Sequence, residues 1–155
     1  MNQLFLFNSQ YEKWACEQVF EAALKLNEIP YRAKQLISHI LTAQQIWHVR
    51  LTGGEFTSSA FPDIDSSEWM QRLNSNMNNM KQYIHSISDD DFKNIISYTN
   101  TKGDVFKNSV EEILTHITHH SAYHRGQIIQ LIRPFVDQPP ATDFISYSRN
   151  LRKNI

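Results

Sequence analysis

Four of the seven histidines in this 155-residue chain lie within nine residues of one another, a density that suggests a metal site. On a helix, residues four apart lie about one turn apart on the same face, so His120 and His124 could both reach one ion. His116 and His120 have the same spacing, so spacing alone does not choose between the pairs. His120 and His124 continue the three- and four-residue steps of the apolar positions between 113 and 131, whereas His116 and His119 flank them.

Each of these histidines could instead be a neutral core residue that is hydrogen-bonded to a neighbour. A metal site would need a third ligand, for which His39 and His48 are the candidates. His39 is in step with the apolar residues of its own stretch. His48 comes nine residues later, about half a turn away at ~100° per residue, and should face the opposite side. We therefore predict His39 as the third ligand, and we place His85 on the surface.

Three neutral imidazoles would leave a divalent cation with its full charge and at least one open coordination position. Catalytic sites have this arrangement, whereas structural zinc sites usually take four ligands rich in cysteine. The open position would let the ion lower the pKa of a bound water or thiol and present it as a nucleophile. Zinc and nickel both suit imidazole ligands, and the sequence does not choose between them.

Several other chemistries lack the residues that they require. The segment from His120 to His124 has no glutamate after its first histidine, where zincin proteases carry one. A di-iron bundle would need Glu-x-x-His motifs and facing glutamates, but the fourth apolar stretch has only Glu111 and Glu112, at its start. The sequence contains no phosphate-binding loop and no dinucleotide fingerprint.

Long amphipathic stretches must supply the framework that positions these histidines. Glycine and proline are rare and separate stretches of roughly 20–25 residues, which suit helices better than strands. Helical periodicity covers residues 7–26, 36–46, 69–87 and 110–131. Capping-box patterns begin the third and fourth of these, at Asp65–Glu68 and Ser109–Glu112, and Pro134 ends the fourth. Residues 95–98 and 105–106 flank Asn100–Gly103 and could form a short hairpin.

These elements predict an all-α fold: an up-down-type four-helix bundle with a short hairpin between helices three and four. The length fits one domain over residues 1–155. Fifteen Lys and Arg against sixteen Asp and Glu give a net charge of −1, which argues against nucleic acid or an acidic membrane as partner. The single cysteine suits a reducing compartment. No signal peptide and no apolar stretch of ~20 residues are found, so we expect a cytoplasmic protein.

The segment His120-Ser-Ala-Tyr-His124-Arg125-Gly126-Gln127 resembles the H-x-x-x-H-R-G-Q signature of the DinB/YfiT-like proteins. Residues 36–40 resemble the second-helix histidine segment of that family, with Trp47 where an aromatic residue is usual. Residues 11–15 are similar to its first-helix Y-x-x-W-A pattern, and residues 139–143 to its exit loop. The resemblance extends from about Tyr11 to Asp143.

This resemblance implies a four-helix bundle whose metal site is formed here by His39, His120 and His124. It also implies a homodimer, and it associates the fold with thiol-dependent transferases and isomerases that activate a low-molecular-weight thiol on the metal. Our leading hypothesis is therefore a thiol transferase acting on a small electrophilic substrate. Alternatives are a metal-dependent hydrolase and a non-catalytic, stress-related bundle that binds a metal or another ligand.

Other residues of the signature have two interpretations each. Arg125 could bind an anionic cosubstrate, or it could be exposed beside the metal-binding face. Gln127 could hydrogen-bond a ligand histidine or line the cavity. Gly126, which costs ~1 kcal/mol against alanine inside a helix, could let another helix approach closely or could simply be tolerated. Asp143 could reach back to the site or cap the final segment, and Cys16 is expected to pack rather than to react.

The N-terminal residues Leu4–Phe7 are all apolar and cover every side of a helical turn, so they cannot all point into one core. Such a surface is usually covered by a partner, and two-fold pairing is the commonest solution for identical chains. We therefore expect a homodimer. The competing explanation is that the same chain covers these residues.

Overall fold

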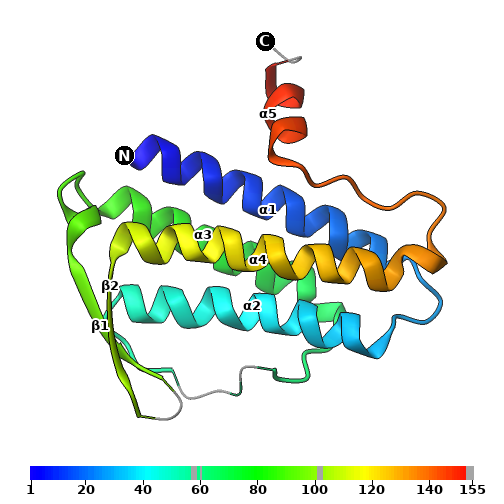
Figure 1. Cartoon of the computed structure of the whole chain (residues 1–155), viewed down its shortest axis with the longest axis horizontal. Coiled ribbons are helices and arrows are strands. Elements are labelled where there is room, and N and C mark those ends of the chain that lie inside the picture. Colours follow the sequence, from blue (N-terminus) through cyan, green and yellow to red (C-terminus); the bar gives the residue numbers. More distant parts are fainter. Residues whose placement is uncertain (57–58, 60, 101–102, 153–155) are drawn as a thin grey trace.

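The computed structural model describes residues 1–56, 59, 61–100 and 103–152 of the chain. It is mostly helical and has one small antiparallel sheet, which confirms the predicted helices and the predicted hairpin (Figure 1). The helices are α1 (Asn2–Leu24), α2 (Tyr31–Leu51), α3 (Trp69–Ser86), α4 (Val110–Ile132) and α5 (Phe144–Arg152), and the strands are β1 (Ile95–Thr99) and β2 (Val105–Ser109). Three short 3₁₀ turns are η1 (Ser66–Glu68), η2 (Asp91–Lys93) and η3 (Arg133–Phe135).

The four long helices pack on one another through their apolar faces. Helix α1 contacts α3 and α4, and α2 contacts the same two helices. In Figure 1 their axes run side by side along the long dimension of the molecule. Trp69 begins α3 in the core, where its ring lies 6.2 Å from that of Phe20 and its Nε1 donates to the carbonyl of Ile64 at 3.1 Å. The contact between α2 and α4 is the one that carries the histidines.

The start of α4 follows the predicted capping box. Ser109 Oγ accepts from the Glu112 backbone N–H at 3.2 Å, and the Glu112 carboxylate accepts from the Ser109 N–H at 2.8 Å. The capping box predicted at Asp65–Glu68 does not form in this way. Asp65 instead accepts from the backbone N–H of Ser67 and caps the short turn η1, which then leads into α3. Ser109 is also the last residue of β2, so the capping residue connects the hairpin directly to α4.

The hairpin pairs β1 with β2 and packs on the end of α2. Arg50 lies between two rings, 4.7 Å from Trp47 and 4.5 Å from Tyr98, and donates to the Thr99 carbonyl at 3.2 Å. Of the predicted turn Asn100–Gly103, Thr101 and Lys102 lie outside the described residues. These contacts attach the hairpin to the helix that carries His39.

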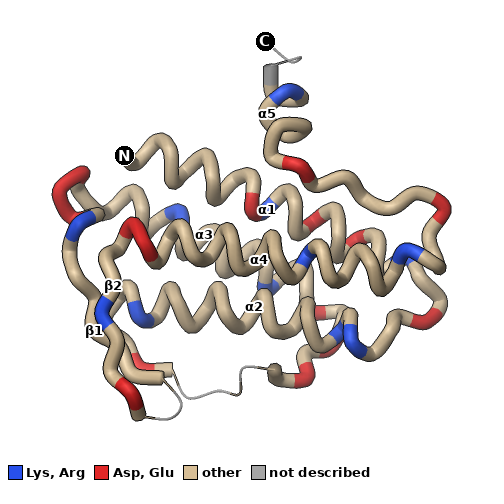
Figure 2. The backbone as a smooth tube through the Cα atoms, viewed as in Figure 1, with Lys and Arg blue, Asp and Glu red and all other residues tan. Residues whose placement is uncertain are grey.

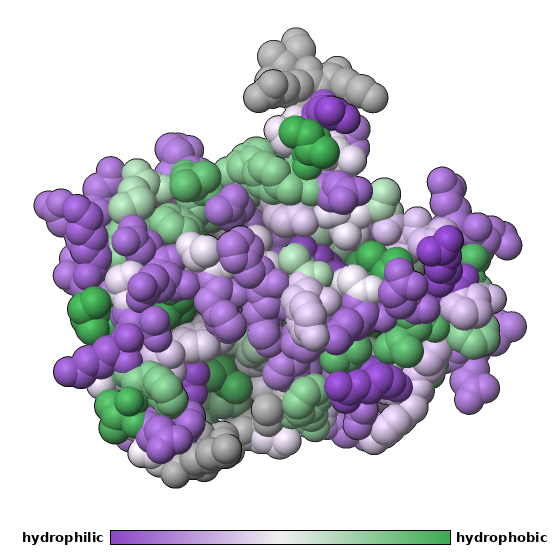
Figure 3. Space-filling model, in the orientation of Figure 1, coloured by the Kyte–Doolittle hydropathy of each residue, from purple (hydrophilic) through white to green (hydrophobic). Residues whose placement is uncertain are grey.

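Helix α5 was not predicted, because its nine residues are too few for a repeating apolar pattern to stand out. It packs on the outside of α1, where Phe144 and Tyr147 meet Phe7 and Tyr11 at ring distances of 5.1–5.7 Å. The Tyr11 hydroxyl also donates to the Thr142 carbonyl at 2.8 Å, which fixes the connection just before α5. Figure 3 shows hydrophobic residues gathered where α5 meets α1.

Most of the apolar N-terminal segment is covered by its own chain. Phe5 is buried and stacks on Phe92 at 5.1 Å, Leu6 is buried, and Phe7 lies against α5. Only Leu4 stays largely exposed, at 57%. The competing explanation for this segment is thus correct for three of its four residues, and Leu4 is the one residue of the segment that could still pack on a partner.

Acidic and basic residues are interspersed over the described chain, and the longest run of one sign is Asp89–Asp91 (Figure 2). None of the helices in the described part combines the length and the apolar character that crossing a membrane would require.

Candidate metal centre

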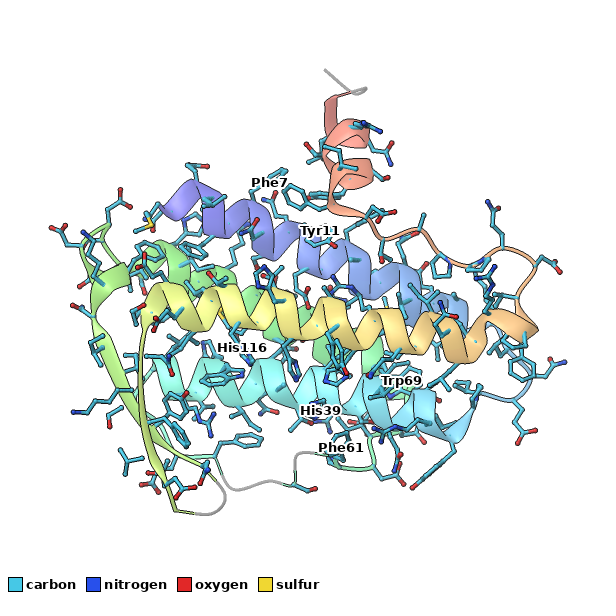
Figure 4. All side chains as sticks on the ribbon, in the orientation of Figure 1. Phe7, Tyr11, His39, Phe61, Trp69 and His116 are labelled. Atoms are coloured by element: carbon cyan, nitrogen blue, oxygen red, sulfur yellow. The ribbon has the colours of Figure 1, made fainter. Side chains whose placement is uncertain are left out.

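Helices α2 and α4 bring His39, His120 and His124 together. Their candidate ligand nitrogens all lie within 4.8 Å of one another, and the Nε2 atoms of His39 and His120 are 3.0 Å apart. The three ring centroids are separated by 4.6–4.9 Å, with the rings steeply inclined to one another. We call these residues the His triad. Figure 4 shows His39 on α2, beside the connection that carries Phe61.

The donor set of the His triad fits a divalent ion that prefers nitrogen. Imidazole nitrogens at ~2.0–2.1 Å from a tetrahedral ion lie about 3.4 Å apart. This separation lies between the 3.0 Å that joins Nε2 of His39 to Nε2 of His120 and the 4.8 Å within which all the candidate nitrogens lie. Small side-chain rotations would therefore bring all three nitrogens to one ion. Two of the candidate ligands are one turn apart on α4 and the third comes from α2, as their places on the apolar faces predicted.

One member of the His triad, His120, stays uncharged at neutral pH. Burial, followed by the neighbouring His124 and His39, lowers the pKa of His120 to about 3. All three side chains are half-buried. A neutral imidazole keeps a lone pair on one nitrogen, which is the form that binds metals.

Gln127 orients one candidate ligand of the triad. Its Oε1 lies 2.8 Å from Nδ1 of His124, three residues earlier on α4. With the proton on Nδ1 donated to this oxygen, Nε2 of His124 keeps its lone pair free for an ion. This is the support that metal-binding histidines usually receive. It agrees with the first of the two interpretations of Gln127.

Aromatic side chains border the triad on its outer side. The ring of Phe61 stacks on His39 at 4.2 Å and is 43% exposed. The exposed Tyr123 meets His124 edge-on at 5.1 Å. The guanidinium carbon of Arg32 lies 5.5 Å from the centroid of the Phe61 ring. Phe61 therefore contacts both a positive charge and His39 of the triad.

The remaining histidines stay outside this cluster. His116 lies between the rings of Trp47 (edge-on, 5.1 Å) and His120 (tilted, 5.3 Å), and it is not one of the three clustered residues. His119 and His85 are exposed. Burial lowers the pKa of His48, which is half-buried near the end of α2 and does not join the triad.

Arg125 is neither exposed nor available to a cosubstrate, so both sequence interpretations of it are wrong. It is 1% exposed, and its Nη1 pairs with Oε2 of Glu12 at 2.5 Å. Its Nη2 donates to the Tyr11 hydroxyl at 3.3 Å. Burial alone would lower the pKa of Arg125, but Glu12 and then Cys16 raise it well above its usual value. The guanidinium is therefore a permanent charge inside the core.

Sequence reasoning did not find the partners of this arginine. Glu12 is 1% exposed, and its Oε1 accepts from Gln44 Nε2 at 3.1 Å and from Cys16 Sγ at 3.4 Å. We call Glu12, Arg125, Gln44 and Cys16 the Glu12 cluster. Burial, followed by the charge of Glu12, raises the pKa of Cys16, so this thiol is an inert packing residue, as expected.

Asp143 lies at the start of α5, not at the triad. Its side chain is exposed, and its carbonyl accepts from the backbone N–H groups of Ser146 and Tyr147 at 3.0 and 3.1 Å. Of its two interpretations, the structure favours the role at the start of the final segment, which its backbone fulfils.

Gly126 does not serve the close approach of another helix. It is exposed in the middle of α4, and a Cβ built on it would meet nothing within 4 Å. We predict that Gly126→Ala raises the free energy of unfolding by roughly 0.5–1 kcal/mol, because alanine costs less backbone entropy in a helix. Urea unfolding would measure the change.

Gly54→Ala is the matched control for this prediction. A Cβ there would lie 2.8 Å from Cγ1 of Val49, so this change should bring no gain. A destabilised Gly126→Ala variant would contradict the prediction and would place another chain against this face of α4.

Comparison with known families places these features in context. The family model described as the DinB family matches residues 9–152. This range contains the whole His triad and all of the Glu12 cluster. No curated protein matches the chain.

Proposed function

We propose that this chain, which belongs to the DinB family, binds a divalent metal ion through His39, His120 and His124 and activates a small thiol there. The observation that carries the proposal is the convergence of three imidazoles from two helices within 4.8 Å. The residues described at this cluster include no carboxylate ligand. Zinc or nickel is the ion that such a donor set favours.

His39, His120 and His124 would hold a divalent ion without neutralising its charge, and the ion would lower the pKa of a thiol bound at its open position. The chain's own residues orient and shield that position. Gln127 fixes the ring of His124, and Phe61 covers one face of His39. Arg32 would attract an anionic group of a thiol or of a small electrophilic substrate that enters beside Phe61.

A thiol-transfer screen tests this proposal. The metal-loaded protein would be offered several low-molecular-weight thiols with small electrophiles, and loss of free thiol and formation of thioether would be followed. We expect transfer that needs the loaded metal and that disappears in His39→Ala. The same variant controls for contaminating transferases.

Two other outcomes would replace the thiol-transfer proposal. Hydrolysis of the electrophile without a thiol would indicate a metal-dependent hydrolase. Metal binding that raises the melting temperature, with no turnover of any substrate, would indicate a non-catalytic metal-binding protein in which the ion stabilises the packing of α2 on α4.

We also propose that the four long helices form an up-down bundle and that residues 1–155 are one domain. Each long helix packs on two others, and short connections join α1 to α2 and the hairpin to α4. The single buried cysteine fits a reducing, cytoplasmic location.

We propose that the protein is a homodimer. Leu4 and Ile145 remain more than half exposed, at 57% and 55%, and an apolar surface of this kind favours self-association. Light scattering at micromolar concentration should give a mass near twice the 18.2 kDa of the chain. A mass near 18.2 kDa would refute the dimer.

A further inference from the structure

One buried carboxylate is hydrogen-bonded to both of the helices that carry the His triad. Oε2 of Glu12 on α1 pairs with Nη1 of Arg125 on α4 at 2.5 Å. Oε1 of the same side chain accepts from Nε2 of Gln44 on α2 at 3.1 Å. Arg125 directly follows the ligand His124, and Gln44 comes five residues after the ligand His39.

The hydrogen bonds of Gln44 set which way its amide faces. Its Oε1 accepts from Asn76 Nδ2 of α3 at 3.4 Å, and the same Asn76 nitrogen donates to the Leu41 carbonyl at 2.8 Å. With the amide oxygen facing α3, the amide nitrogen faces Glu12. The polar contacts thus extend from α3 through α2 and α1 to α4.

We propose that Glu12, Arg125 and Gln44 are positioning residues that fix the rotation of α4 against α2 and thereby bring the three imidazoles to one point. The inference rests on the proposed metal binding. Successive residues of a helix are ~100° apart, so fixing Arg125 towards α1 also fixes the direction of His124.

The reason is the cost of leaving a buried charge without its partner. Arg125 and Glu12 are each 1% exposed, and a rotated or shifted α4 would separate two charges that water cannot reach. The triad holds this geometry less firmly by itself, because its rings are half-buried and a single 3.0 Å contact joins the Nε2 atoms of His39 and His120. The Glu12 cluster therefore excludes packings that the histidines alone would tolerate.

The test measures Co²⁺ binding, because the visible absorption of this ion reports the geometry of its ligands. The variant Glu12→Gln/Arg125→Met removes both charges together, a change that often leaves a fold as stable as before. We expect it to melt within a few degrees of the parent, to bind Co²⁺ roughly tenfold to 100-fold more weakly and to show a shifted absorption spectrum. Lys13→Met/Glu17→Gln removes the outer pair of α1 and should leave all three measurements unchanged.

A second variant keeps the inference testable if the first does not fold. Gln44→Met removes the hydrogen bonds of Gln44 to Glu12 and to Asn76 but no charge, and it too should weaken Co²⁺ binding and shift the spectrum. If the folded variants bind Co²⁺ with the affinity and spectrum of the parent, the positioning role is wrong and the cluster is merely structural. A parent protein that takes up no Co²⁺ would instead refute the proposed function, and this inference with it.

Discussion

Replacing His124 with alanine should remove most of the divalent metal that the parent protein holds at about one ion per chain. The triad has three candidate ligands within 4.8 Å, and none of the described residues offers a fourth ligand in that cluster. Losing a residue that only supports a ligand costs 10–100-fold in metal affinity, so losing a ligand should cost roughly 100-fold or more. Elemental analysis after gel filtration would measure the loss.

Two other histidine variants serve as matched controls. His48→Ala changes a half-buried residue of the helix that carries His39, and His85→Ala changes an exposed residue of α3. Both should keep the metal content of the parent, because neither side chain belongs to the triad. Equal metal content in His124→Ala and the parent would refute the assignment, whereas loss in His48→Ala would place the ion elsewhere along α2.

The convergence of the triad could be predicted because it follows from helical geometry alone. His120 and His124 share a face through their four-residue spacing, and His39 is in step with the apolar face of its own helix. Two apolar faces in one core must meet, so the histidines within them meet as well. The contact from Gln127 to His124 follows from the same spacing, since residues three apart on a helix are neighbours.

The ion pair of the Glu12 cluster could not be predicted from either charge taken alone. Glu12 lies seven residues after the buried Phe5 and four before the buried Cys16, in step with the apolar face of α1. Arg125 lies three residues before the buried Ile128 in the same way. A charged residue on an apolar helix face predicts a buried ion pair only when a residue of opposite charge lies on the apolar face of another helix.

The contact of Phe61 with the outer side of the triad could not be predicted from periodicity, because Phe61 lies in a loop. Phe61 reaches His39 from the connection between α2 and α3, and a connection has no repeating pattern from which side-chain positions can be predicted. The same is true of α5, which is held by the aromatic contacts of Phe144 and Tyr147 with α1. Both are tertiary contacts between segments distant in sequence.

Removing Arg125 alone should destabilise the fold far more than the loss of an exposed charge does. Arg125→Met leaves the carboxylate of Glu12 in the core with Gln44 and Cys16 as its remaining described partners. Breaking one side of a buried ion pair typically costs about 3–5 kcal/mol, because the remaining charge cannot regain its hydration. Urea unfolding followed by circular dichroism should show a loss of that size in the free energy of unfolding.

A second arginine–glutamate pair of this chain makes the comparison direct. Arg72 donates from Nε and Nη2 to Oε2 of Glu68 at 3.0 and 2.8 Å, but its side chain is 43% exposed. Since water screens this pair, Arg72→Met should cost no more than about 1 kcal/mol. The same substitution is thus made in two ion pairs that differ chiefly in burial. If Arg125→Met lost no more stability than Arg72→Met, the buried pair would not hold α1 and α4 together, and the packing of Phe5, Cys16 and Ile128 would suffice.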